Sequence, residues 1–146
     1  MIREATWRDI NAIWDLCVQA HAGSPYSGIP LDELLTRKLI QRFTTSPSHF
    51  CWVAHGGEAL TGVLAASVEQ IAWSHARQAS DMLFYCAVPG DGARLVRRFI
   101  GWAKERNVAL WGISVSFGGD LEKTHRLLTS CGLQHIGGIF IGLKQG

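Results

Sequence analysis

Apolar positions recur along the chain with two spacings, and their order predicts the secondary structure. The short alternating segment Ile2–Ala5 predicts a first strand, and Thr6 or Asp9 can cap the helix after it, whose apolar residues recur at helical spacing. A loop is expected over His21–Pro30, which is rich in turn-forming residues, and a second helix over Leu31–Phe43. The chain is thus expected to begin with one strand and two helices.

The middle of the chain predicts a hairpin and a further strand. Two apolar runs, Phe50–Ala54 and Ala59–Ala72, flank the turn His55–Glu58, whose Gly-Gly pair is a strong hairpin signal. The polar stretch Ser74–Ser80 is expected to be a turn, and the apolar run Asp81–Val88 the next strand.

The remaining residues alternate between helix and strand. We expect a basic helix, a buried strand, a turn, a helix capped by Asp120, and a last strand after Gly132. These elements are expected over Gly92–Arg106, Val108–Ser116, Phe117–Gly119, Leu121–Cys131 and Gly132–Lys144. The resulting order, β-α-α-β-β-β-α-β-α-β, predicts a single α/β domain over residues 1–146 with a mixed sheet.

Composition narrows the class of protein. Apolar residues make up 47% of the 146 residues and charged residues 18%, which is typical of a globular chain with a substantial core. The net charge of +2 is too small to indicate binding to nucleic acid or to a membrane surface. No apolar run is long enough for a transmembrane helix, and the charged first residues do not match a signal peptide.

Cysteines and histidines give no metal signature. The four cysteines are widely spaced within apolar segments, which favours reduced core thiols and a cytoplasmic protein. The six histidines show no metal-binding spacing, so no metal is expected.

The most informative segment is the strand, glycine turn and basic helix over Asp81–Arg106. Pro89–Gly92 lead directly into the helix, whose first N–H groups have no intrahelical partner and attract anions. Arg94 in the first turn opposes the helix dipole unless something negative lies nearby. The turn is therefore a candidate phosphate site, with a plain strand–helix turn and a solvated arginine as the alternative.

Four segments in this order resemble the GNAT superfamily of acyl-CoA N-acyltransferases. They are IREAT with the helix after it, FCWVAHGGEALTGVLAASV, AVPGDGARLVRRFIGWAKERNVALWGISV and HRLLTSCGLQHIGGIF. The resemblance covers nearly the whole chain and implies a sheet whose fourth and fifth strands splay apart to form a slot for acetyl-CoA. It also implies transfer of an acetyl group to a primary amine by direct attack, the amine belonging to a small molecule or a protein.

The resemblance places the cofactor along the fourth strand and the loop that begins the helix. It implies that the backbone of the fourth strand binds the pantetheine arm, that the loop binds the pyrophosphate, and that two arginines one turn along reach phosphate oxygens. These cofactor-binding candidates are Phe84, Cys86, Ala87, Val88, Gly90, Asp91, Gly92, Ala93, Arg94, Arg97 and Arg98.

The sequence departs from the family at three positions. Ala87 occupies the place of a basic or amide residue in the family's loop, and Asp91 puts a carboxylate inside it. Many members carry a tyrosine four residues before the glycine that ends the last helix, where this chain has Leu128. These differences keep open an alternative, a GNAT-fold binding or structural module with weak or no catalysis.

Candidate catalytic groups follow from the same comparison. Glu69, Asp81 and Tyr85 are candidates for the base, although water could serve instead. His125 and Ser130, near the end of the last helix, are candidates for the acid. Each also has an ordinary structural explanation. The loop His21–Pro30, the second helix and the Trp73–Ser80 turn are expected to select the acceptor, and an exposed Trp73 would suit an acceptor site or a homodimer contact.

Overall fold

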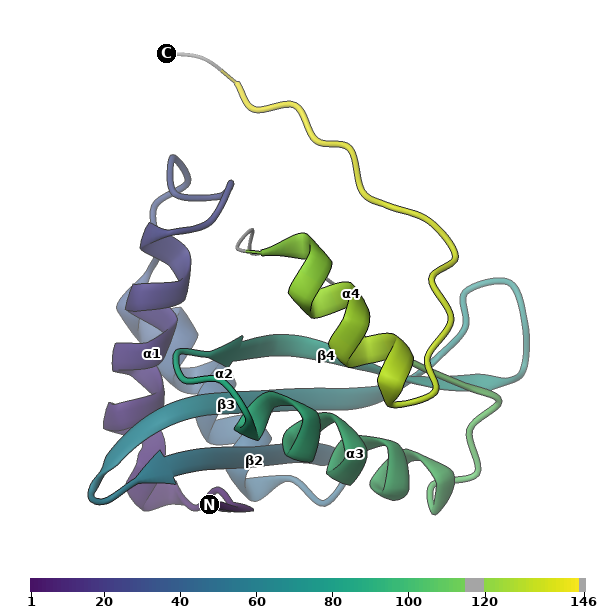
Figure 1. Ribbon diagram of the computed structural model, residues 1–146, viewed down its shortest axis with the longest axis horizontal. Helices are drawn as coiled ribbons and strands as arrows, with labels where there is room; N and C mark the ends of the chain where they lie inside the picture. The colour runs from purple at the N-terminus through teal and green to yellow at the C-terminus, as the bar shows by residue number, and fades with distance from the viewer. Residues whose placement is uncertain (115–119, 145–146) are drawn as a thin grey trace.

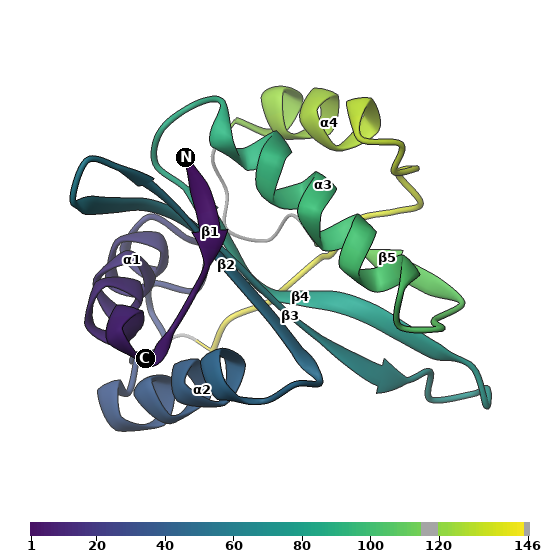
Figure 2. The same cartoon turned by 90° about the horizontal axis from the view of Figure 1, so that it is seen from below.

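The computed structural model describes residues 1–114 and 120–144, and these residues form one sheet with helices on both faces (Figures 1 and 2). The strand order is β1-β2-β3-β4-β5, in which neighbours are antiparallel except for the parallel pair β4–β5. The strands are β1 Ile2–Glu4, β2 His49–Gly56, β3 Ala59–Gln70, β4 Arg77–Cys86 and β5 Leu110–Gly112. The helices are η1 Trp7–Asp9 (a 3₁₀ turn), α1 Ile10–Ala22, α2 Glu33–Thr45, α3 Asp91–Lys104 and α4 Leu121–Ser130.

Two hydrophobic cores lie on opposite faces of the sheet. Helices α1 and α2 cover one face and α3 and α4 the other, which Figure 2 shows along the edge of the sheet. In β3, Val63 and Ala65 pack toward the first pair of helices, whereas Leu64 and Ala66 pack toward the second. Burial on both faces explains why this strand is apolar at nearly every position rather than at alternate ones.

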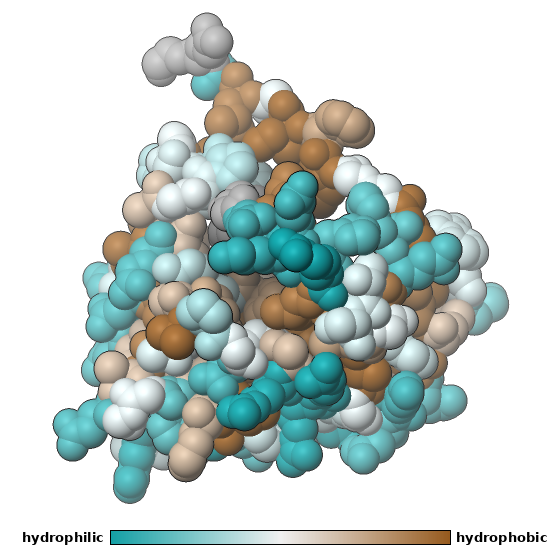
Figure 3. All heavy atoms as spheres, viewed as in Figure 1, coloured by the Kyte–Doolittle hydropathy of each residue, from teal (hydrophilic) through white to brown (hydrophobic). Residues whose placement is uncertain are grey.

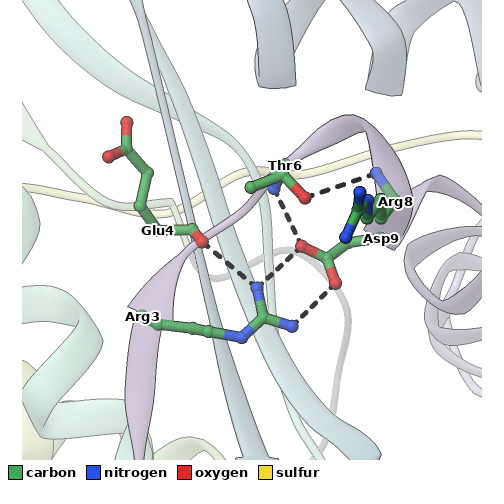
Figure 4. A network of polar contacts seen from close by, with 5 residues as sticks. All are labelled: Arg3, Glu4, Thr6, Arg8 and Asp9. Carbon is green, nitrogen blue, oxygen red and sulfur yellow. Dashed lines mark hydrogen bonds and ion pairs between the residues drawn. The ribbon is translucent and has the colours of Figure 1, made fainter.

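The start of the chain is held by one buried carboxylate, that of Asp9, which is 7% exposed. It accepts hydrogen bonds from both terminal nitrogens of the Arg3 guanidinium and from the Thr6 backbone N–H, each at 2.8 Å (Figure 4). The Thr6 hydroxyl in turn accepts from the Arg8 backbone N–H, so Thr6 and Asp9 form a capping box on the 3₁₀ turn that leads into α1, whereas the Asp9 side chain makes no capping hydrogen bond to α1 itself. The hydrogen bonds from Arg3 hold the pKa of Asp9 below its usual value.

Strand β4 begins earlier than the sequence predicts. Ser74–Ser80 is expected to be a turn, but Arg77–Ser80 already pairs with the end of β3 over Ser67–Gln70. That prediction is wrong in its second half because polar composition says nothing about backbone pairing, and the long β3 offers a partner there. The turn itself is confined to the residues around Trp73, which is 86% exposed as expected.

The end of the chain differs most from expectation. Within the described residues, 133–144 pair with no strand, so the final strand expected over Gly132–Lys144 is not formed. Gly137, Gly138 and Gly142 weaken strand formation there. The segment stands away from the body with apolar side chains uncovered, Phe140 being 98% exposed (Figures 1 and 3). The other predicted helices and strands are present in the predicted order and confirm the mixed α/β class.

Strand β5 covers only the centre of the stretch Val108–Ser116 that was expected to be a strand. Residues 115–116 and the turn predicted over Phe117–Gly119 lie outside the described residues. Across residues 1–114 and 120–144, no helix is long and apolar enough to span a membrane.

Candidate functional site

Strands β4 and β5 diverge about halfway along β4. The strand β5 pairs with Gln78, Ala79 and Ser80 only, whereas β4 continues to Cys86. At the point of divergence Asp81 joins the two segments, because its Oδ1 accepts from the backbone N–H of Ser114 at 2.7 Å and from the Ser114 hydroxyl at 3.2 Å. Burial raises the pKa of Asp81, and these two bonds oppose that rise by favouring the carboxylate. Asp81 thus links β4 to the segment after β5 at the point where the two diverge, and we call these two hydrogen bonds the clasp.

A cavity of about 480 Å³ opens beyond this clasp, and we call it the slot. It lies between the end of β4, the first turn of α3, one face of α4 and the last turn of α1. The residues that line it are Gln19, Ala20, Gly23, Phe84, Tyr85, Cys86, Ala87, Val88, Pro89, Gly90, Gly92, Ser114, Asp120, Lys123, Thr124 and Leu127. Six of the cofactor-binding candidates that the resemblance implies are among them: Phe84, Cys86, Ala87, Val88, Gly90 and Gly92.

One edge of β4 faces the slot with its hydrogen-bonding groups unpaired by β5. The Ala87 N–H donates to the Thr61 carbonyl of β3 at 2.8 Å, so odd-numbered residues of this stretch point their backbone groups toward β3. Backbone groups alternate between the two edges of a strand, and those of Phe84 and Cys86 therefore point the other way. This edge can pair with an extended ligand.

Helix α3 points its first turn at the same cavity. Gly90, at φ +106°, is its N-cap residue and supplies no side-chain cap to the first N–H groups. Gly92 is buried, and a Cβ there would lie 3.1 Å from Leu127 Cδ1 and 3.6 Å from Phe84 Cζ. Both glycines line the slot, so the backbone of this turn is accessible to a ligand from the cavity.

The charged residues of α3 lie outside the slot. The Asp91 carboxylate is 3.7 Å from the chain's terminal ammonium and 3.3 Å from the Arg94 guanidinium. Arg98 stacks on the ring of Trp52 at 4.3 Å, and Arg97 is exposed on the same helix. Neither these side chains nor Ala93 line the cavity, and its one lining cation among the described residues is Lys123.

Helix α4 turns a different face to the slot than the family comparison implies. Leu128 is 8% exposed and packs in the core under α3, whereas Leu127 and Thr124, one turn earlier, line the cavity. His125 lies against the ring of His135 at 5.6 Å, and the Ser130 hydroxyl donates to the Leu127 carbonyl at 2.6 Å. The structure does not bring these two acid candidates into the slot.

The base candidates lie far apart. Tyr85 is half-buried in the slot lining, and Asp81 is engaged with Ser114 at its base. Glu69 pairs with Gln78, eight residues before Cys86 on β4, and is exposed toward the opposite end of the sheet. Burial raises the pKa of the Cys86 thiol to about 11, so this cysteine is neutral at pH 7. Tyr85 is the candidate that the fold brings to the cavity.

Several slot residues have no signal in the sequence. Gln19, Ala20 and Gly23 enter because α1 ends beside β4, and Ser114 enters through the bond to Asp81. Helical spacing from Asp120 could have shown that Lys123, Thr124 and Leu127 share a face.

In β4 the register with β3 shifts so that Met82 has no partner in β3, which is a β-bulge that nothing in the sequence marks.

The described residues hold no cluster of three or more His, Cys, Asp or Glu side chains arranged for a metal ion. No protein-family model and no curated protein sequence matches the chain.

Solved structures match the whole described fold at low sequence identity. A point mutant of the BH1408 protein from Bacillus halodurans has a TM-score of 0.73 at 17% identity, with 99% of each chain covered. An aminoglycoside 6'-N-acetyltransferase from Acinetobacter haemolyticus has a TM-score of 0.68 at 14% identity over 99% of this chain and 98% of that one. An aminoglycoside acetyltransferase from an uncultured soil sample, solved with sisomicin, has a TM-score of 0.64 at 13% identity, covering 99% and 96%. The chain has the fold of the GNAT acetyltransferases.

Proposed function

We propose that the chain is an N-acetyltransferase domain that transfers the acetyl group of acetyl-CoA to a primary amine by direct attack. The observation that carries this proposal is the slot, in which a strand edge that β5 does not pair and a helix N-terminus without a side-chain cap face one cavity. The structural neighbours that are acetyltransferases support the reaction class. The free cysteines, buried or half-buried, support a reduced, cytoplasmic setting.

The residues present fit a ligand that has an extended amide-bearing arm and a pyrophosphate. The outward backbone groups of Phe84 and Cys86 would pair with the amides of the arm as a neighbouring strand does. The N–H groups at the start of α3 would bind phosphate oxygens, and Gly92 lets the ligand approach them closely. Lys123 supplies a positive charge from the facing helix. Asp91 does not oppose this binding, because its carboxylate is turned toward two cations outside the slot.

The chemistry of the slot favours direct attack over a covalent enzyme intermediate. Acetyl-CoA would supply the acetyl group as a thioester. Burial raises the pKa of the Cys86 thiol to about 11, which makes this thiol a poor nucleophile at pH 7 and disfavours a covalent intermediate on Cys86. We infer that Tyr85, a lining residue with an ionisable hydroxyl, accepts the proton of the amine, while Asp120 caps α4 by accepting from the Lys123 backbone N–H. The other contribution is positioning.

One set of observations favours a second candidate, a CoA-binding or structural module without catalysis. No arginine lines the slot among the described residues, and Leu128 packs in the core where many family members place a tyrosine. A module of this kind would lack turnover with every amine.

The two functions differ in an acetyl-transfer assay. The protein is incubated with acetyl-CoA and a panel of primary amines, while free thiol release and the mass of each amine are followed. Matched release of thiol and addition of one acetyl group to an amine supports the enzyme. Thiol release without an acetylated amine is hydrolysis and contradicts the proposal, as does the absence of both when acetyl-CoA is bound.

A further inference from the structure

A second cavity, of about 190 Å³, lies between α1, α2 and β4, on the face of the sheet that α1 and α2 cover. We call it the apolar cavity. Its lining residues are almost all aliphatic or aromatic: Ile13, Cys17, Ala20, His21, Leu31, Thr36, Leu39, Ile40, Phe43, Cys51, Ala65, Met82 and Leu83. No Asp, Glu, Lys or Arg is among these described residues.

The few polar atoms of the lining are already occupied or neutral. The His21 Nε2 is 2.7 Å from the Ile29 carbonyl oxygen, and the Thr36 hydroxyl donates to the Asp32 carbonyl at 2.7 Å. Burial raises the pKa of the Cys17 thiol to about 11 and that of Cys51 to about 12, so both are uncharged at neutral pH. A charged group would lose its hydration in this cavity without gaining a partner, whereas a hydrocarbon group would lose nothing.

The volume suits one ring. An apolar cavity of roughly 150 Å³ stays dry when empty and binds benzene, and the cavity here is about 190 Å³. An aromatic ring or a branched alkyl group fits this space, and a polar, many-ringed ligand does not.

The apolar cavity runs into the slot along two elements. On β4, Met82 and Leu83 line the cavity and the next two residues line the slot, at a rise of about 3.3 Å per residue. On α1, Ala20 lines both. A group seated in the cavity would therefore hold whatever is attached to it beside Tyr85. The bulge at Met82 puts a flexible, half-exposed side chain at this junction.

We propose that the apolar cavity holds the hydrocarbon body of the acceptor, so that the acceptor is a monoamine carrying an aromatic ring or a branched alkyl group. This inference rests on the proposed acetyl transfer. It distinguishes the chain from its aminoglycoside-modifying neighbours, because a polycation would need carboxylates that the described lining does not offer.

The experiment compares 2-phenylethylamine, ethylamine and sisomicin as acceptors at fixed acetyl-CoA. Burying a ring contributes about as much as burying a phenylalanine side chain, so kcat/KM should be about 10- to 150-fold higher for 2-phenylethylamine than for ethylamine. Sisomicin should be the poorest acceptor. Equal kcat/KM for 2-phenylethylamine and ethylamine, or a preference for sisomicin, would overturn the inference and leave the proposed acetyl transfer intact.

Two neighbouring residues of α2 give a matched pair of variants. Thr36→Trp fills the cavity from a half-buried lining position, and Leu35→Trp adds the same ring at an exposed position that lines neither cavity. The first should reduce the preference for 2-phenylethylamine at least tenfold while ethylamine turnover persists, and the second should leave the preference unchanged. Met82→Trp fills the cavity from β4 and replaces Thr36→Trp in the test if that variant does not fold. A preference for 2-phenylethylamine that is unchanged in both Thr36→Trp and Met82→Trp contradicts the inference.

Binding of 2-phenylethylamine is also followed directly by saturation-transfer NMR without acetyl-CoA. Binding that Thr36→Trp abolishes and Leu35→Trp retains, in a protein that acetylates no amine, would contradict the proposed function and support the apolar site. No binding, together with no ring preference in turnover, rejects the site itself.

Discussion

At the scale of single residues, the contacts explain features that are puzzling in the sequence. Asp91 puts a carboxylate in the candidate phosphate-binding turn, yet this carboxylate lies 3.3 Å from Arg94 and 3.7 Å from the terminal ammonium, outside the slot. Gly92 is favoured by close packing rather than by backbone conformation, because a Cβ would lie 3.1 Å from Leu127 Cδ1 and that side chain would have to shift by a few tenths of an ångström. Residue types alone could not reveal either contact, since both depend on how elements meet.

The Arg3–Asp9 pair gives a prediction for stability and its pH dependence. Asp9→Asn should lower the free energy of unfolding at pH 7 by about 1–2 kcal/mol, because a buried neutral amide replaces the carboxylate that accepts charge-assisted hydrogen bonds from the exposed Arg3 and from the Thr6 N–H. The folded-state pKa of Asp9 is lowered, so this contribution is fully present above the ordinary value of 3.8 and is lost as the pH falls through the folded-state pKa.

Urea unfolding between pH 7 and pH 2 measures this effect. The difference in unfolding free energy between the wild type and Asp9→Asn should shrink on the acid side of 3.8. A constant difference over the whole range would contradict the assigned role of the carboxylate.

At the scale of elements, one face of α4 lines the slot and another packs in the hydrophobic core. Leu127 lines the slot, while Leu128 packs in the core. If a missing acid limits turnover, Leu127→Tyr should raise kcat about tenfold or more by adding a hydroxyl that can protonate the departing sulfur. Leu128→Tyr should not raise kcat, and it should destabilise the fold by about 1–3 kcal/mol through overpacking.

Steady-state kinetics gives kcat for both variants and thermal unfolding gives their stability, and together they show which face of α4 lines the slot. A rise in kcat for Leu128→Tyr but not for Leu127→Tyr would mean that the face assignment is wrong.

The clasp between β4 and β5 carries a second prediction at this scale. Asp81→Ala removes the acceptor of both hydrogen bonds from Ser114 and should weaken acetyl-CoA binding severalfold by loosening the base of the slot. Calorimetric titration measures the affinity, and Glu69→Ala, on the exposed end of β3, is the control that should leave it unchanged. An unchanged affinity in Asp81→Ala would show that the clasp does not shape the slot.

Much of the element order could be predicted from the sequence, and the failures have identifiable causes. Helical spacing and capping residues located α1 to α4, since these signals are local. The start of β4 was missed because Arg77–Ser80 is polar, and only its pairing with β3 makes it a strand. In the site, the glycine turn was located from local chemistry. The slot-facing side of α4 and the end of α1 were not, because they depend on long-range packing.

At the scale of the whole molecule, the segment 133–144 extends away from the body with large apolar side chains exposed. Ile136 is 89% exposed, Ile139 66% and Phe140 98%. Contiguous exposed apolar surface favours association between chains. This segment, rather than Trp73, is therefore the part of the described surface that best suits a homodimer contact.

Sedimentation velocity tests this role of the segment. The wild type should self-associate as its concentration rises, and Ile139→Asp with Phe140→Asp should shift it toward the monomer with little change in melting temperature. Replacing Trp73 by Asp is the matched control and should leave association unchanged. A wild type that is monomeric at all concentrations would contradict the prediction.

The most direct test of the central claim is calorimetric titration of acetyl-CoA into the wild type and two glycine variants of α3. Gly92→Glu places bulk and negative charge in the slot, whereas Gly101→Glu adds the same side chain at an exposed position of the same helix with open space around it. We predict binding in the micromolar range for the wild type and Gly101→Glu, and a loss of at least 100-fold in a folded Gly92→Glu. No heat of binding by the wild type at millimolar acetyl-CoA, or equal binding by Gly92→Glu, would contradict the account.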